Sequence, residues 1–175
     1  MTVTASSAAD LQQSGRVSAA ALVVAVVAAL TVGGALILEH VFGYVPCMLC
    51  LWGRWPYYVA APLAALAALL AGRGNLGAAR LLLVLAAIAL LAGAAIGVYH
   101  AGVEWRFWPG PTSCAGANAA PSSAGGLLEQ MRTTRIVPCD QAAFRVFGVS
   151  LAGYSALISL GLAAVAFIGV RRGRS

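Results

Sequence analysis

Four long apolar stretches constrain this 175-residue chain more than any other feature of its sequence. They run approximately over 17–38, 51–71, 79–99 and 146–170, and a helix needs about 20 apolar residues to cross the hydrocarbon core of a bilayer. None alternates as a barrel strand does, and a backbone surrounded by lipid must satisfy its own hydrogen bonds. The sequence therefore predicts an all-α membrane protein, a four-transmembrane-helix bundle that forms a single membrane domain over residues 1–175. We expect the first stretch to remain as a span, because its apolar core is too long for a typical signal peptide.

The arginines predict how these spans are oriented. All 11 basic residues are Arg, and those in the short segments have a single acidic neighbour. Short flanks set orientation most strongly, so both termini are expected in the cytoplasm. Two spans separate the loops 39–50 and 100–145, so both loops emerge together on the opposite, oxidising face. The net charge of +6 reflects this orientation, and no nucleic acid partner is expected.

The long loop has two parts with different composition. Residues 108–126 are rich in Pro, Gly, Ser and Ala, which predicts a mobile arm that carries Cys114. Residues 127–137 place Leu127, Leu128 and Met131 on one helical face, which predicts a short amphipathic helix on the membrane surface. An ordered loop with some helix is the alternative.

Small residues recur at helical spacing in two of the spans. Gly93 and Gly97 form one small-xxx-small pair, and Ser155 and Ser159 form another. Such pairs allow helix backbones to approach closely, so they favour a compact bundle.

Four cysteines, Cys47, Cys50, Cys114 and Cys139, lie in the two loops that share a face. A zinc site is disfavoured because only one pair of cysteines is close-spaced, so no metal is expected. Structural disulfides are the main alternative, but a bond within Cys-x-x-Cys closes almost no loop and stabilises little. Redox chemistry explains the close-spaced pair better.

The position of Cys50 supports that interpretation. It follows Pro46 at the expected start of the second helix, where free amide groups and the helix dipole stabilise a thiolate. Arg54 lies one helical turn further on and would place a fixed charge beside that sulfur or bind the oxygen of a ligand. The alternative for Arg54 is a membrane anchor whose charged end reaches the interface.

Together these fragments resemble the DsbB family of disulfide-bond formation proteins, across nearly the whole chain after residue 16. The matching segments, in order, are Glu39-His40, Pro46-Cys47-Met48-Leu49-Cys50 with Arg54, Tyr99-His100-Ala101-Gly102-Val103-Glu104, Gly110-Pro111-Thr112-Ser113-Cys114, Pro138-Cys139-Asp140 and Phe147-Gly148-Val149-Ser150-Leu151. One departure is Gly53, where many relatives carry a polar or acidic residue.

The resemblance implies an electron relay in a bacterial inner (cytoplasmic) membrane, with both cysteine loops in the periplasm. A periplasmic thioredoxin-fold dithiol protein of the DsbA type would attack Cys114, whose loop partner Cys139 exchanges with Cys47. Cys50, beside Arg54, would then pass electrons to a membrane quinone, either ubiquinone or menaquinone. The implied disulfides are Cys47–Cys50 and Cys114–Cys139.

The sequence leaves the other polar residues at the membrane boundary less defined. His100 and Glu104 are expected to line the quinone pocket and handle its protons, since imidazole titrates near neutral pH. The alternative is that they anchor the interface beside Trp105, Phe107 and Trp108. Glu39 and His40 are weaker candidates for the pocket. Trp52 and Trp55 are expected in the aromatic belt or the core, and flanking a quinone ring is the alternative for them.

Two other functions compete with this interpretation. A quinone reductase of the vitamin K epoxide reductase type also pairs loop cysteines with Cys-x-x-Cys in a helix bundle, but the order of the cysteines here argues against it. A membrane protein with two structural disulfides and no activity is the other.

Overall fold

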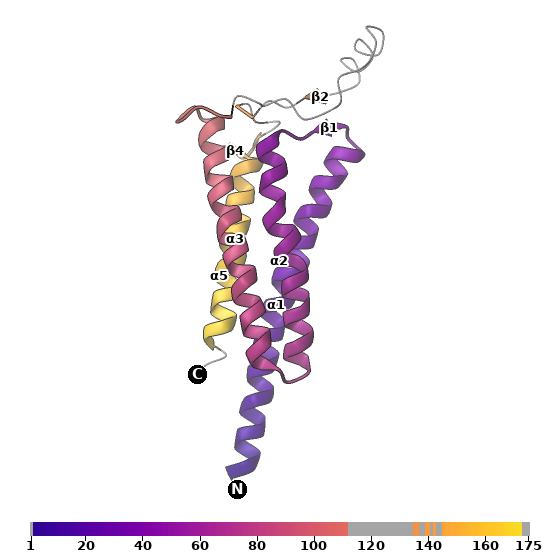
Figure 1. Ribbon diagram of the computed structural model, residues 1–175, viewed down its shortest axis with the longest axis vertical. Helices are drawn as coiled ribbons and strands as arrows, with labels where there is room; N and C mark the ends of the chain where they lie inside the picture. Colours follow the sequence, from indigo (N-terminus) through magenta and orange to yellow (C-terminus); the bar gives the residue numbers. More distant parts are fainter. Residues whose placement is uncertain (1, 112–134, 137–138, 141, 143–144, 173–175) are drawn as a thin grey trace.

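Four long helices dominate the computed structural model of the protein (Figure 1). They are α1 (Thr2–His40), α2 (Met48–Gly72), α3 (Leu76–Glu104) and α5 (Leu151–Arg172). The structure describes residues 2–111, 135–136, 139–140, 142 and 145–172. In that part of the chain all four helices are long and apolar enough to cross a membrane, which confirms the predicted four-helix architecture.

The observed helices differ most from the predicted spans in three places. Helix α1 begins well before residue 17, at Thr2. Helix α3 continues to Glu104, so His100 and Glu104 lie in its last turns and not in the following loop. Helix α5 begins at Leu151 because residues 145–150 form a hairpin instead of the first helical turn.

The helices pack in sequence order, α1 on α2, α2 on α3 and α3 on α5, and α5 also contacts α1. Their shared core consists mainly of Ala, with a few larger residues such as Leu83 and Leu90. Large apolar side chains cover the outside of the bundle, including Leu30, Leu69, Ile88 and Leu157. An apolar exterior over small core residues suits a bundle that is solvated by lipid.

Gly93 and Gly97 lie where helix α3 packs closely against its neighbours. A Cβ on Gly97 would lie 2.9 Å from the backbone nitrogen of Ala156 on α5, and one on Gly93 would lie 2.9 Å from Cβ of Pro56 on α2. The small-xxx-small pattern therefore marks a real close contact here. Ser155 and Ser159 instead contact Tyr57, whose hydroxyl donates to the Ser155 carbonyl oxygen and accepts from Ser159 Oγ.

Two short two-stranded β-ribbons lie at one end of the bundle. Strand β1 (Tyr44–Val45) pairs in parallel with β2 (Arg135–Ile136), and β3 (Arg145–Val146) pairs antiparallel with β4 (Val149–Ser150). The β3–β4 turn has positive φ at both Phe147 and Gly148, a turn whose twist matches that of the hairpin strands. Most of the predicted amphipathic helix lies outside the described residues, but its expected last turn at Arg135–Ile136 is a strand.

The start of α1 and the end of α5 lie at the opposite end of the bundle from these ribbons (Figure 1). The turn between α2 and α3 lies at the same end as the termini. The segment that carries Cys47 and Cys50 and the segment that carries Cys139 therefore share one end, as the predicted topology requires.

Candidate functional site: a thiol centre beside an apolar cavity

The β1–β2 ribbon brings two distant cysteines together. Its register pairs Val45 with Ile136, and Cys47 and Cys139 follow these two residues closely in the chain. Cys139 hydrogen-bonds to Cys47, and both are buried in a small apolar cluster with Leu49 and Val103. The ribbon thus aligns the second loop cysteine with the Cys-x-x-Cys motif.

Cys47 and Cys50 occupy the first turn of α2, where the sequence predicted them. Cys47 is the N-cap residue, and its sulfur accepts a hydrogen bond from the Cys50 backbone N–H at 3.4 Å. The Cys47 thiol donates to Cys50 Sγ at 3.1 Å, so the two sulfurs are in direct contact. A small rotation of either side chain would bring them to the roughly 2.05 Å of a disulfide.

The environment of Cys47 strongly favours its neutral form. The hydrogen bond to Cys50 and then burial raise the pKa of Cys47 to about 12, and hydrogen bonds from His100 and Cys139 only partly offset this. A thiolate is therefore costly at this position unless a partner compensates its charge.

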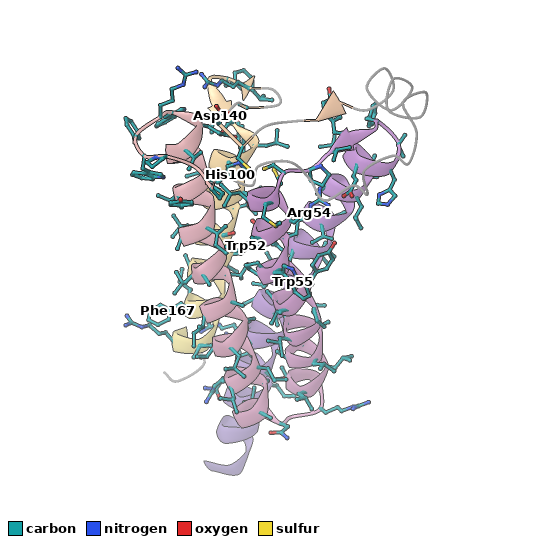
Figure 2. The ribbon with its side chains drawn as sticks, turned by 45° about the horizontal axis from the view of Figure 1, so that its top comes forward. Trp52, Arg54, Trp55, His100, Asp140 and Phe167 are labelled. Atoms are coloured by element: carbon teal, nitrogen blue, oxygen red, sulfur yellow. The ribbon has the colours of Figure 1, made fainter. Side chains whose placement is uncertain are left out.

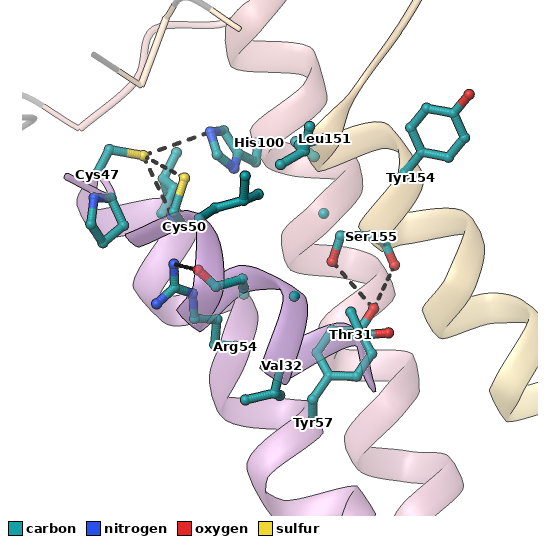
Figure 3. A pocket seen from close by; sticks show the side chains of 18 of the residues that line it. Thr31, Val32, Cys47, Cys50, Arg54, Tyr57, His100, Leu151, Tyr154 and Ser155 are labelled. Atoms are coloured by element: carbon teal, nitrogen blue, oxygen red, sulfur yellow. Dashed lines mark hydrogen bonds between the residues drawn. The ribbon is translucent and has the colours of Figure 1, made fainter. Parts of the chain in front are cut away.

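His100 lies between Cys47 and Glu104. Its Nε2 atom is 3.8 Å from Cys47 Sγ (Figure 3). The same atom is 3.8 Å from Glu104 Oε1, and both His100 and Glu104 are buried. Because the same ring nitrogen faces both groups, it can hydrogen-bond to only one of them at a time. Glu104 Oε2 is also buried and has no hydrogen-bond partner among the described residues, so it is available to a molecule in the cavity.

Arg54 has a partner that the sequence did not indicate. Its guanidinium donates to the Glu39 carboxylate at the end of α1 and lies 3.5 Å from the Ala35 carbonyl oxygen. Arg54 and Cys50 line the same cavity, as expected from their spacing of one turn. Glu39 was only a weak candidate for the pocket because its contact with Arg54 depends on how α1 packs against α2.

A cavity of about 370 Å³ connects these groups. All four helices contribute to its lining, which is mostly apolar, and its polar residues include Cys50, Arg54, His100 and Glu104. Tyr57 and Ser155 form a further polar contact deeper in the bundle (Figure 3). An apolar pocket of roughly 300–1,000 Å³ with a few placed polar groups is typical of small-molecule sites.

Three other candidates lie away from this cavity. Trp52 and Trp55 are on the outside of α2, with 56% and 66% of their surfaces exposed, so they do not flank it (Figure 2). His40 is exposed and its ring contacts the Leu36 carbonyl oxygen of its own helix. Cys114 lies outside the described residues.

Fold and site together define a class of protein, a four-helix membrane protein with a thiol centre at one end of the bundle. Residues 17–169 match the sequence model of the DsbB family, described as disulfide bond formation protein DsbB. The match covers most of the chain, so this protein belongs to the DsbB family. Membership confirms the resemblance seen in the sequence and implies a disulfide-generating oxidoreductase in a membrane.

One curated relative also matches along most of its length. The uncharacterized protein RP370 of Rickettsia prowazekii (strain Madrid E) is 26% identical over 151 residues, which are 85% of this chain and 84% of that protein. No solved structure matches the chain.

Proposed function

We propose that this protein reoxidises a periplasmic dithiol protein of the DsbA type and passes the electrons to a membrane quinone. The observation that carries the proposal is the contact between Cys139 and Cys47, beside Cys50 and the cavity. Three of the four cysteines thus lie in the order that a relay from the long loop to a lipid-soluble acceptor requires.

The proposed relay consists of two disulfide exchanges. The partner's thiolate attacks Cys114 of a Cys114–Cys139 disulfide, and resolution leaves the partner oxidised and the loop pair reduced. Cys139 then attacks Cys47 of a Cys47–Cys50 disulfide and displaces the Cys50 thiolate. Cys114 next attacks Cys139 of the Cys139–Cys47 bond, which restores the Cys114–Cys139 disulfide and leaves Cys47 and Cys50 as a dithiol for the acceptor. Each exchange breaks one S–S bond and forms another, so the electrons reach Cys50 through disulfide exchange alone.

The cavity fits a quinone by shape and by its polar groups. A bound quinone supplies an acceptor for two electrons and two protons. Arg54 would hold a ring oxygen through its guanidinium, and Cys50 lies on the same wall of the cavity. His100 and Glu104 would hold and donate protons, and the unpartnered Glu104 Oε2 supports this role because it is buried at the cavity.

We also propose the orientation that the arginines indicate. Both termini would lie in the cytoplasm, and the ribbons and cysteines would lie at the periplasmic face of the inner membrane. The start of α1 and the end of α5 lie at the opposite end of the bundle from β1 and β4, which supports this arrangement (Figure 1). Lipid would contact the apolar outer surface.

A coupled assay tests the function directly. Purified protein is mixed with a reduced thioredoxin-fold dithiol partner and a short-chain ubiquinone or menaquinone, and quinone absorbance and partner thiols are followed together. We expect one quinone to be reduced for each partner dithiol that is oxidised. Partner oxidation without quinone consumption would show that a quinone is not the electron acceptor. No thiol exchange at all would favour a protein with structural disulfides and no activity.

A further inference from the structure

Three soft donor atoms converge at the start of α2. Cys47 Sγ, Cys50 Sγ and His100 Nε2 all lie within 4.8 Å of one another. Cys139 hydrogen-bonds to Cys47 and has no exposed surface, but it does not belong to this group of donors. The sequence disfavoured a metal because it contained only one close-spaced pair of ligands. The fold supplies a third donor, His100, from α3.

The distances between these donors are close to those of a tetrahedral zinc site. Zinc binds sulfur at about 2.3 Å and nitrogen at about 2.0–2.1 Å, which puts two sulfurs about 3.8 Å apart and sulfur and nitrogen about 3.6 Å apart. Here Cys47 Sγ is 3.1 Å from Cys50 Sγ and 3.8 Å from His100 Nε2. Modest rotations of the cysteine side chains would open the sulfur pair around an ion.

Charge balance also favours a divalent ion at this position. The cysteines are largely buried, so isolated thiolates are costly there. Two thiolates and one divalent cation form a neutral unit, and binding releases the two thiol protons to solvent. His100 is held near Cys47 by its place in the penultimate turn of α3, so the nitrogen donor is positioned before the ion arrives.

We propose that the fully reduced protein binds a thiophilic divalent cation, Zn²⁺ or Cd²⁺, through Cys47, Cys50 and His100, with the fourth position open to water. The site exists only in the dithiol state, because a Cys47–Cys50 disulfide removes two of its donors. Binding itself does not depend on the quinone. In the proposed cycle the ion would hold the dithiol reduced and inhibit turnover.

Direct binding to the reduced protein in detergent tests the site. Cd²⁺ is titrated and its thiolate charge-transfer absorbance is followed in the ultraviolet, and Zn²⁺ affinity is measured by competition with a chromophoric chelator. We expect one ion per chain in the reduced protein and none at these donors after Cys47–Cys50 is oxidised. Equal binding in both redox states would overturn the proposal.

Variants identify the ligands. Cys50→Ser and His100→Ala should each lower the Zn²⁺ affinity at least about tenfold, because even the hydrogen-bonding partners of metal ligands are worth 10–100-fold. His40→Ala is the matched control, since His40 is exposed at the end of α1, and it should bind normally. Cys114→Ser controls for the loss of a thiol and should also bind normally.

The variants also separate the possible failures. Helical content by circular dichroism shows whether each variant is folded. If folded Cys50→Ser or folded His100→Ala binds as tightly as the unmodified protein, the assigned site is wrong. Cys139→Ser should bind normally, and if it loses as much affinity as the other two variants, the three-ligand assignment fails. Because these measurements use no quinone and no partner, they are independent of the proposed oxidase activity.

Discussion

Arg54 on α2 forms an ion pair with Glu39 on α1, and both residues line the cavity that contains Cys50. The side chains are 14% and 29% exposed, so the pair is partly shielded from solvent. Glu39 fixes the guanidinium at the cavity wall and occupies part of its hydrogen-bonding capacity. Arg54 therefore reaches a ligand with its remaining N–H groups, in an orientation that α1 helps to set.

Arg54→Ala should weaken quinone binding and leave the first thiol exchange intact. The loss of one charge-assisted hydrogen bond costs about 1.5–3 kcal/mol, which corresponds to about a ten- to hundredfold rise in apparent quinone KM if binding limits. Steady-state kinetics with varied quinone measures the KM, and a single-turnover assay measures partner exchange. Arg73→Ala, at the exposed opposite end of α2, is the control. Normal quinone kinetics with impaired membrane insertion would mean that Arg54 is only an anchor.

Cys139→Ala should trap the partner on the long loop. Without the resolving thiol, the partner remains bound to Cys114 as a mixed disulfide, which is detected by non-reducing electrophoresis and mapped by mass spectrometry. Adding Cys114→Ala to this variant should abolish the trapped species. A mixed disulfide through Cys47 would instead show that the order of the relay is wrong.

Cys47 should ionise only at high pH in the reduced protein, since its pKa is raised to about 12. The neutral thiol then predominates at every lower pH, and alkylation by iodoacetamide rises only as the pH approaches that value. Cys50→Ala removes the hydrogen bond that contributes most to the shift, so the alkylation profile of Cys47 should move to lower pH. Mass spectrometry at Cys47 over a pH series measures both profiles. If the two alkylation profiles had the same midpoint, the hydrogen bond to Cys50 would not be the main cause of the raised pKa of Cys47.

Gly97→Ala should destabilise the bundle. The added Cβ would lie 2.9 Å from the Ala156 nitrogen and 3.0 Å from its Cα, and such overpacking typically costs about 1–3 kcal/mol. Gly33→Ala on α1 is the matched control, because nothing lies within 4 Å of its added Cβ. It should be neutral or stabilising by up to about 1 kcal/mol through helix propensity. Thermal unfolding in detergent compares the two, and equal stabilities would contradict the close α3–α5 contact.

Labelling of intact spheroplasts should establish the orientation of the bundle. A membrane-impermeant thiol reagent should label reduced Cys114 from outside. A cysteine introduced as Arg73→Cys, in the exposed turn between α2 and α3, should react only after permeabilisation. The reverse pattern would place the termini in the periplasm and remove the relay from its oxidising compartment.

The local features of the site could be predicted from sequence because they depend on neighbouring residues. Pro46 and the apolar run after Cys50 predict a helix that begins at the motif, and one turn of that helix fixes the spacing of Cys50 and Arg54. The four spans followed from length and hydropathy alone, because lipid leaves the backbone few alternatives. The Gly93–Gly97 spacing also indicated the close contact of α3.

Contacts between distant segments could not be predicted in the same way. The end of the predicted amphipathic helix is strand β2 in the structure, because its backbone pairs with β1. This pairing with a distant segment cannot be recognised from the periodicity of residues 127–137. Tyr57 and the serines of α5 meet only because α2 and α5 face each other.

The sequence by itself determined the helices, the shared face of the cysteine loops and the family to which the chain belongs. Only the tertiary structure decided that Cys139 meets Cys47, that His100 lies between Cys47 and Glu104, and that Glu39 pairs with Arg54. The physical reason is that hydrophobic length and helix spacing act within a segment, whereas these contacts depend on the packing and register of segments far apart in the chain.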